Sequence, residues 1–222
     1  MTNSYFADFL VYRADRAYRA LPAAGKAAAR AEFAAVLFDA PGVTVRGCYS
    51  MVGLRHDADF TLWLVAESVD PLQDLAARLL RTRLGQYLET TQVFVGMARG
   101  ASRYVADHLP AFVQGKPPRK YLSLYPFVKT ADWYLLSFEE RRRLMIQHGD
   151  LAEPHSTLTN TVSSFGINDG EFILAFETDD LPDFVAMVER LRAAEVRKYT
   201  LKDTPILLGI RKDVDAVLQD LG

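Results

Sequence analysis

Cysteine is almost absent from this sequence. The chain of 222 residues contains one cysteine, Cys48, which excludes an internal disulfide framework and any zinc site built from several thiolates. Cys48 lies in the segment VTVRGCYSMVG, where apolar and polar residues alternate as they do in a strand. We therefore expect a buried and chemically inert thiol.

Long apolar runs and a large excess of one charge are also missing. No apolar segment approaches the length that spans a bilayer, and residues 1–16 lack the apolar core of a signal peptide. The expectation is a soluble, cytoplasmic globular protein. Its formal net charge of -2 gives no bulk electrostatic reason to bind nucleic acid. This charge still permits a local basic pocket for an anionic ligand.

The chain contains an internal repeat with a fixed spacing. Gly53 and Gly96 lie 43 positions apart, and Gly166 and Gly209 also lie 43 apart. In both halves the first glycine opens a hairpin, as in SFGINDGEFILAFET, and the second lies in a strand, as in TPILLGIRK. Each half is therefore predicted to carry a hairpin, a helix and a closing strand at matched positions.

A strand and a helix are predicted before each hairpin, which completes a β-α-β-β-α-β order of the ferredoxin-like kind. The strands FTLWLVAES and EFILAFETD alternate in a way that gives each sheet one face toward helices and one toward a second sheet. The predicted class is α+β, with two ferredoxin-like repeats forming a dimeric α/β barrel within one chain. The expected divisions are an N-terminal half (1–100), a connector (101–120) that is too apolar for a floppy linker, and a C-terminal half (121–222).

The segment LYPFVKTADWYLLSFEERRRLMIQHG, from Leu124 to Gly149, combines a strand with a helix. Pro126 is predicted to break the strand, because proline lacks the amide donor that strand pairing needs. Ser137 and Glu140 have the spacing of a capping box that starts a helix. His148 is predicted to be its last residue, with Gly149 as a left-handed cap.

His148 falls on the apolar face of this helix, together with Leu144 and Met145. Its direction and semi-dry setting suit a neutral imidazole ligand of a metal, although the helix dipole alone also favours histidine at such an end. His155 and His56 are predicted to be solvated. No multi-ligand metal spacing is present, so a single ligand would point to a macrocycle that supplies the other donors.

Several nearby residues have both a structural and a functional interpretation. Tyr125 suits a core tyrosine or a residue at a pocket edge, and Trp133 suits simple packing on the next helix. Lys129 could be a solvated charge, and His108 could be a capping residue in the connector. None of these patterns decides the function by itself.

Taken together, these residues resemble the chlorite dismutase–like superfamily of haem proteins, and in particular its actinobacterial coproheme decarboxylase branch. The resemblance is carried by HLPAF, YLSLYPFVKTADWYLLSFEERRRLMIQHG and NTVSSFGINDGEFILAFETDDL. It implies paired ferredoxin-like halves that form a barrel, a homopentamer, and a C-terminal half that holds the porphyrin, coproheme III or haem b.

The resemblance also implies roles for five residues. His148 would be the axial ligand of the haem iron, Tyr125 the tyrosine that becomes a radical, and His108 the distal histidine. Lys129 and Trp133 would hold propionate groups. Lys129 stands where relatives have arginine, and this exchange keeps the charge but loses the bidentate fork.

The implied reaction is the hydrogen peroxide-dependent oxidative decarboxylation of iron-coproporphyrin III to haem b. His108 would take a proton from peroxide as general base, and oxidised Tyr125 would abstract a hydrogen atom from a propionate β-carbon. Loss of carbon dioxide then leaves a vinyl group. Coproheme would thus be both substrate and redox centre.

Other functions stay open at this level. They are a non-catalytic haem or coproheme binder, a chlorite dismutase-like or peroxidase haem enzyme, and a barrel without haem. Thr161 disfavours chlorite chemistry, because chlorite dismutases carry a distal arginine thirteen residues after the proximal histidine. Asp150 and Glu153 also depart from the family pattern, since basic residues are expected near a propionate-rich ligand.

Overall fold

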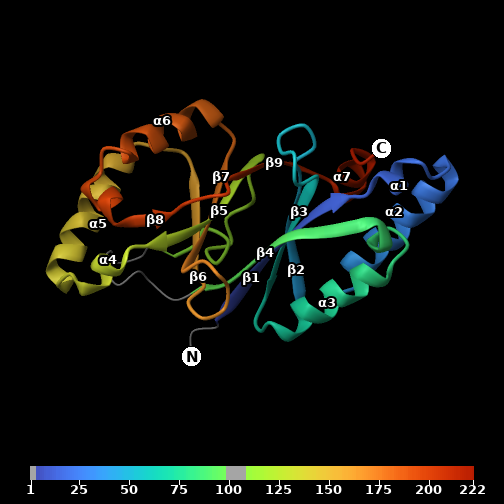
Figure 1. Ribbon diagram of the computed structural model, residues 1–222, viewed down its shortest axis with the longest axis horizontal. Coiled ribbons are helices and arrows are strands. Elements are labelled where there is room, and N and C mark those ends of the chain that lie inside the picture. The colour runs from blue at the N-terminus through green and yellow to red at the C-terminus, as the bar shows by residue number, and fades with distance from the viewer. Residues whose placement is uncertain (1–3, 99–108) are drawn as a thin grey trace.

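The computed structural model describes residues 4–98 and 109–222 and has a mixed α+β fold, as predicted (Figure 1). The strands are β1 (Tyr5–Ala14), β2 (Val43–Ser50), β3 (Phe60–Ala66), β4 (Leu88–Ala98), β5 (Tyr121–Lys129), β6 (Leu158–Ser163), β7 (Phe172–Thr178), β8 (Thr200–Lys202) and β9 (Leu207–Lys212). The α-helices are α1 (Arg16–Arg19), α2 (Ala23–Phe38), α3 (Asp70–Arg81), α4 (Ala131–Leu135), α5 (Phe138–Ala152), α6 (Leu181–Leu191) and α7 (Val214–Gln219). Two short 3-10 helices are η1 (Gly85–Tyr87) and η2 (Glu195–Tyr199).

The strands pair in the order β7-β6-β4-β1-β3-β2-β9-β5-β8, and β7 also pairs with β5. This last pairing makes the order cyclic for all of the described strands except β8. Strands of the first half (β4-β1-β3-β2) and of the second half (β6-β7-β5-β9) follow one another around the cycle. The two groups meet where β4 pairs with β6 and where β2 pairs with β9.

The repeated glycines lie where the two groups of strands meet. A Cβ atom added at Gly96 in β4 would lie 2.5 Å from Val162 Cγ2 of β6, and one added at Gly209 in β9 would lie 2.8 Å from Tyr49 Cβ of β2. Each glycine therefore permits a close approach that any side chain would block. The matched spacing in the sequence marks equivalent positions in the fold.

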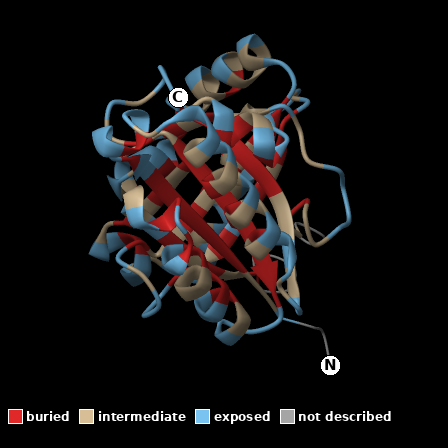
Figure 2. Cartoon of the chain, turned by 90° about the vertical axis from the view of Figure 1, so that its right-hand side faces the viewer, coloured by how far each residue is buried: buried red, intermediate tan, exposed pale blue. Residues whose placement is uncertain are grey.

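The helices form two layers on opposite sides of the strands (Figure 1). In the first half, α2, α3 and α7 cover the strands and enclose a continuous buried cluster, in which Phe33 packs edge-on against Tyr12 and Phe60. Buried residues follow the strands and the inward faces of these helices (Figure 2). Cys48 belongs to this cluster, and burial raises the pKa of its thiol to about 12. The prediction of a buried, inert thiol is thus confirmed.

A second cluster fills the space between the strands of the two halves. Phe9 and Trp63 of the first half and Leu122, Leu124 and Ile173 of the second are buried together there. Apolar burial from both halves on the faces away from the helices fixes how the two groups of strands pack.

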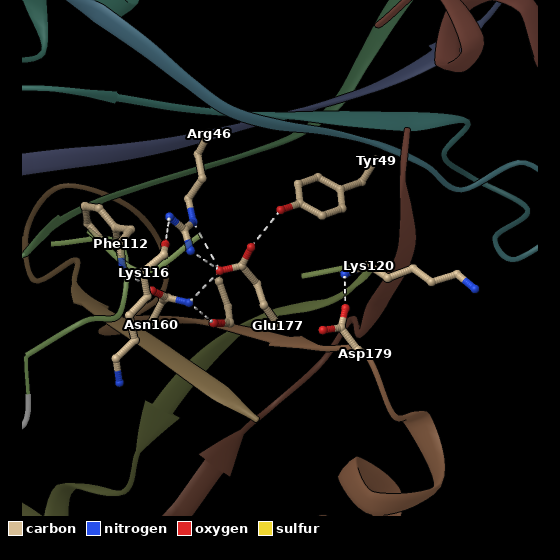
Figure 3. A network of polar contacts seen from close by, with 9 residues as sticks. Arg46, Tyr49, Phe112, Lys116, Lys120, Asn160, Glu177 and Asp179 are labelled. Carbon is tan, nitrogen blue, oxygen red and sulfur yellow. Dashed lines mark hydrogen bonds and ion pairs between the residues drawn. The ribbon is translucent and has the colours of Figure 1, made fainter. Parts of the chain in front are cut away.

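A buried polar network crosses the same space (Figure 3). Glu177 of β7 is fully buried and accepts hydrogen bonds from Arg46 and Tyr49 of β2 and from the Asn160 amide of β6. The Asn160 carbonyl oxygen accepts from the Phe112 amide at 2.9 Å. The described end of the connector is therefore attached to both halves, to Asn160 through Phe112 and to Arg46 through the Lys116 carbonyl.

Two local predictions are wrong. Strand β5 continues through Pro126, which pairs with Ile173 of β7. On its other side β5 pairs with β9 up to Leu124 and with β8 from Val128, so Pro126 falls between two ladders, where its missing amide costs no bond.

Helix α5 also continues past His148 to Ala152, so Gly149 is an interior helical residue and not a cap. Its C-terminal carbonyls are instead satisfied by Arg190 of α6, whose guanidinium donates to the carbonyls of Leu151 and Ala152. The start of α5 follows the prediction, because Ser137 Oγ accepts from the Glu140 amide at 3.1 Å. Among the described residues, no helix is both long and apolar enough to cross a membrane.

Candidate functional site

The strand face beneath α5 and α6 is incompletely buried. In the first half, the helix-facing residues Leu10, Tyr12, Phe60, Leu62 and Leu64 are at most 3% exposed. In the second half, five large residues on the corresponding face are only half-buried: Tyr125, Phe127, Phe172, Leu174 and Phe176. A well-packed domain does not leave so many aromatic side chains partly uncovered beneath its own helices.

His148 occupies the helical position that a core aromatic residue fills in the first half. Phe33 is the eleventh residue of α2, and His148 is the eleventh residue of α5. Phe33 is 0% exposed and closes the gap between α2 and the strands, whereas His148 is half-buried. The second half therefore replaces a packing residue with an imidazole at this position.

The apolar stripe of α5 is the face on which the sequence predicts His148 to lie. Leu144 belongs to a small buried cluster with Trp133 of α4 and with Ala194 and Val196 beside η2, and Met145 packs against it. His148 follows Leu144 by four positions, so its side chain lies on the same face of the helix. The expected direction of the imidazole is therefore toward the interior of the second half.

Tyr125 lies on the half-buried face of β5, opposite Leu174 of β7. Its ring centroid is 5.9 Å from that of Phe176. Burial, and secondly the carboxylate of Asp203, raise the pKa of the Tyr125 phenol above its ordinary value. The phenol is therefore held neutral at physiological pH.

A cationic group lies at the end of the same strand. Lys129 is 9% exposed, and its Nζ atom lies 5.0 Å from the ring centroid of Phe127 and 4.5 Å from that of Trp133. In the described part of the chain this ammonium forms no ion pair with a carboxylate. Burial lowers the pKa of Lys129 to about 8, although Glu171 opposes this shift. A buried cation stacked on aromatic rings is suited to receive an anionic ligand.

Three charged residues of this site were not predicted from the sequence. Asp203 accepts hydrogen bonds from Arg192 at 3.0 Å and Arg197 at 2.7 Å, and all three influence the Tyr125 phenol. They follow α6 in the chain and return to β5 through the pairing of β8 with β5 and through the hydrogen bond of the Thr130 amide to the Tyr199 carbonyl. Their sequence context gives no local pattern that marks them.

Lys129 and Trp133 lie together at the end of β5, Tyr125 lies four residues earlier in the same strand, and His148 lies on the helix that packs against Trp133. His108 lies outside the described residues. Thr161 is exposed on β6 and pairs with Leu174, the residue that also pairs with Tyr125. Thr161, thirteen residues after His148, thus lies on the same three-strand surface as Tyr125.

The other histidines differ in their exposure. The His56 side chain is 88% exposed, which confirms the prediction. The prediction of a solvated His155 is wrong, because its side chain is only 15% exposed and lies beside the Glu153 carboxylate. Asp150 and Glu153 themselves are exposed. Within the described ranges no three histidine, cysteine or acidic side chains gather in a metal-binding group.

Comparison with known proteins gives one consistent family. The sequence profile of the chlorite dismutase family matches residues 26–212. The coproheme decarboxylase of Mycolicibacterium smegmatis is 40% identical over 182 residues, covering 81% of this chain and 78% of that protein. The chlorite dismutase of Ideonella dechloratans is 26% identical over 227 residues, covering 97% and 79%.

The fold agrees with the sequence comparison. The structure of a chlorite dismutase variant from Candidatus Nitrospira defluvii superposes with a TM-score of 0.90 at 25% identity, covering 100% of this chain and 96% of that one. The family profile spans most of the chain, and the strand pairing and helical layers described above lie within it. The chain therefore belongs to the chlorite dismutase family.

Proposed function

We propose that this protein is a coproheme decarboxylase, which converts iron-coproporphyrin III to haem b with hydrogen peroxide. The half-buried aromatic face of β5 and β7 is the observation that carries the proposal, because an apolar macrocycle bound between this face and α5 would cover it. The 40% identity to a coproheme decarboxylase favours this member of the family.

The residues of the site fit an iron porphyrin with several propionates. His148 would supply the axial imidazole, as a neutral ligand on an apolar helix face. Lys129 would hold a propionate by charge, and the Trp133 ring beside its ammonium would limit the space around that carboxylate. Arg192 and Arg197 add positive charge next to the β5 face, which suits a ligand with four carboxylates.

The reaction removes two electrons and carbon dioxide from each of two propionates. For one propionate, R–CH₂CH₂–COO⁻ reacts with H₂O₂ and H⁺ to give R–CH=CH₂, CO₂ and two H₂O, so atoms and charge balance. The bound iron supplies the redox chemistry by which peroxide is reduced. His108 would accept the peroxide proton as general base.

Tyr125 would carry the oxidising equivalent to the propionate. Because its phenol is held protonated, it loses an electron and a proton together and then abstracts hydrogen from the propionate β-carbon. The half-buried setting of Tyr125, between Phe176 and the charged group around Asp203, keeps this phenol close to the ligand face and away from bulk water.

Chlorite dismutation is the less suitable activity. Thr161 cannot supply the cationic donor that the distal arginine gives to chlorite dismutases, and it is exposed on the strand surface that Leu174 shares with Tyr125. A non-catalytic porphyrin binder would need neither Tyr125 nor His108, and this chain carries both.

The proposal also covers the division of the chain into two halves and the number of subunits in the assembly. We interpret the cyclic strand order as the dimeric α/β barrel of the family, with ferredoxin-like halves at 1–100 and 121–222 joined by the connector 101–120. The C-terminal helix α7 packs on the first half, so the two halves share their helical layers. A homopentamer in the cytoplasm is the expected working form.

The proposal is tested by anaerobic reconstitution with coproheme, stepwise addition of peroxide, and chromatographic separation of the porphyrins. The wild type is expected to lose two carboxyl groups and form haem b, and Tyr125→Phe is expected to bind coproheme without converting it. Tyr121→Phe, on the same face of β5, is the matched control and should remain active. Equal inertness of wild type and Tyr125→Phe would reject the decarboxylase.

A further inference from the structure

Glu171 extends the pairing between β5 and β7 with its side chain. The backbone ladder ends at the pair Phe127 and Phe172, and the Glu171 amide then donates to the Phe127 carbonyl at 3.2 Å. The next donor on β5 is the Lys129 amide, which is bound by Glu171 Oε2 at 2.7 Å. A carboxylate oxygen thus replaces the backbone carbonyl that a longer β7 would have supplied.

The same oxygen also holds α4. The Tyr134 hydroxyl donates to Glu171 Oε2 at 2.6 Å, and Tyr134 directly follows Trp133 in the chain. The Trp133 ring lies 4.5 Å from Lys129 Nζ. One carboxylate oxygen therefore fixes the backbone of Lys129 and the helical turn that carries its aromatic neighbour.

We infer that Glu171 is a positioning residue for anion recognition, which holds Lys129 and Trp133 in the arrangement that receives a carboxylate of the bound porphyrin. This inference deepens the proposed function and rests on it. Glu171 binds the backbone amide of Lys129 and forms no ion pair with its ammonium. The positive charge of Lys129 therefore remains available to an anionic ligand.

The charge of Glu171 has a second effect on Lys129. Burial and the guanidinium of Arg197 both lower the pKa of the Lys129 ammonium, and Glu171 is the group that raises it. Replacing the carboxylate with an amide should therefore lower that pKa further, while an amide oxygen can still accept the Lys129 and Tyr134 hydrogen bonds. Glu171→Gln thus removes the negative charge and keeps the hydrogen bonds, whereas Glu171→Ala removes both.

The test compares wild type, Glu171→Gln, Glu171→Ala and the control Asp169→Asn, which changes an exposed carboxylate two residues away. In the protein without porphyrin, NMR measures hydrogen exchange of the Lys129 amide and titration of its side chain. In the presence of coproheme, optical titration measures Kd from pH 6.5 to 9.5.

Glu171→Ala is expected to speed exchange of the Lys129 amide and to weaken coproheme binding by roughly 10-fold or more at pH 7, as for loss of a charge-assisted hydrogen bond. Glu171→Gln is expected to preserve protection of the Lys129 amide and most of the coproheme affinity at pH 7. Because the Lys129 pKa is lower in this variant, its affinity should begin to fall at a lower pH than in the wild type. Asp169→Asn should match the wild type in both experiments.

The inference is overturned if both Glu171 variants bind coproheme with the wild-type affinity and pH profile. It is also overturned if Glu171→Gln loses as much affinity as Glu171→Ala without any change in Lys129 titration. Should the wild type fail to bind coproheme, the proposed function fails instead, and the amide exchange of Glu171→Ala still decides whether Glu171 positions Lys129. If Glu171→Ala does not fold, Glu171→Gln and its Lys129 titration decide the inference.

Discussion

His148 stands on α5 where Phe33 stands on α2, eleven residues into each helix. Phe33 is fully buried against Tyr12 and Phe60, whereas His148 is only half-buried. The helical layer over the first half is thus closed by an aromatic side chain, and we propose that a bound porphyrin completes the layer over the second half.

The comparison of His148 with Phe33 predicts how His148→Phe changes stability and coproheme binding. His148→Phe should stabilise the porphyrin-free protein by about 1 kcal/mol, because additional apolar area is removed from water at this position, and it should prevent coproheme binding through iron. Urea unfolding and optical titration measure the two effects.

Two controls accompany this exchange. Phe33→His should destabilise the protein by about 3 kcal/mol, because it removes a buried aromatic ring. His56→Phe, in an exposed turn, should change neither stability nor binding by a measurable amount. A His148→Phe protein that is less stable than wild type would contradict the account of an unfilled layer.

Lys129 predicts a pH dependence of coproheme binding. Its pKa is about 8 in the porphyrin-free protein, and a bound propionate favours the protonated ammonium, so binding takes up a proton above that pH. Affinity should therefore be constant below about pH 7 and should fall as pH rises through 8, by at most about 10-fold per pH unit. Optical titrations between pH 6.5 and 9.5 test this.

Substitutions of Lys129 test whether this residue causes the fall of coproheme affinity with rising pH. Lys129→Arg should flatten the profile, because a guanidinium stays charged over the whole range. Lys129→Met should bind weakly at every pH, and Lys26→Met, on α2, should keep the wild-type profile. An unchanged slope in Lys129→Arg would exclude Lys129 as the titrating group.

The buried pair of Arg46 and Glu177 predicts a large cost for removing one charge (Figure 3). Glu177→Gln leaves the Arg46 guanidinium buried without its counter-charge, which should lower the free energy of unfolding by about 3 kcal/mol or more. The double variant Arg46→Met with Glu177→Gln should cost less than the sum of the single changes.

An exposed ion pair provides the comparison. The Arg119 and Asp179 side chains are 43% and 54% exposed, so Asp179→Ala should lower the free energy of unfolding by less than about 1 kcal/mol.

Urea unfolding of the single and double variants measures the coupling between Arg46 and Glu177. If the two changes in the free energy of unfolding are strictly additive, the two side chains do not depend on one another and the prediction for the buried pair is wrong.

The α+β class and the start of α5 at Ser137 could be predicted because both depend on spacing along one chain segment. Gly96 and Gly209 are required where strands meet closely, and a histidine four residues after Leu144 must share its helix face.

The predictions for Pro126 and Gly149 were wrong because segments distant in the sequence determine the backbone hydrogen bonding at these two positions. Pro126 is tolerated because β8 and β9 leave a gap beside it, and α5 extends past Gly149 because Arg190 caps it from α6. Asp203 and Glu171 reach the site through strand pairing with β5 and through a side-chain bond. Such contacts leave no pattern of spacing that a single sequence displays.

The central claim is that His148 binds the iron of the porphyrin. Resonance Raman spectroscopy of the reduced coproheme complex measures it directly, because an iron–histidine bond gives its own stretching band. The account predicts this band in the wild type and in His155→Ala, and its loss in His148→Ala. A band that persists unchanged in His148→Ala would contradict the assignment and the site built around it.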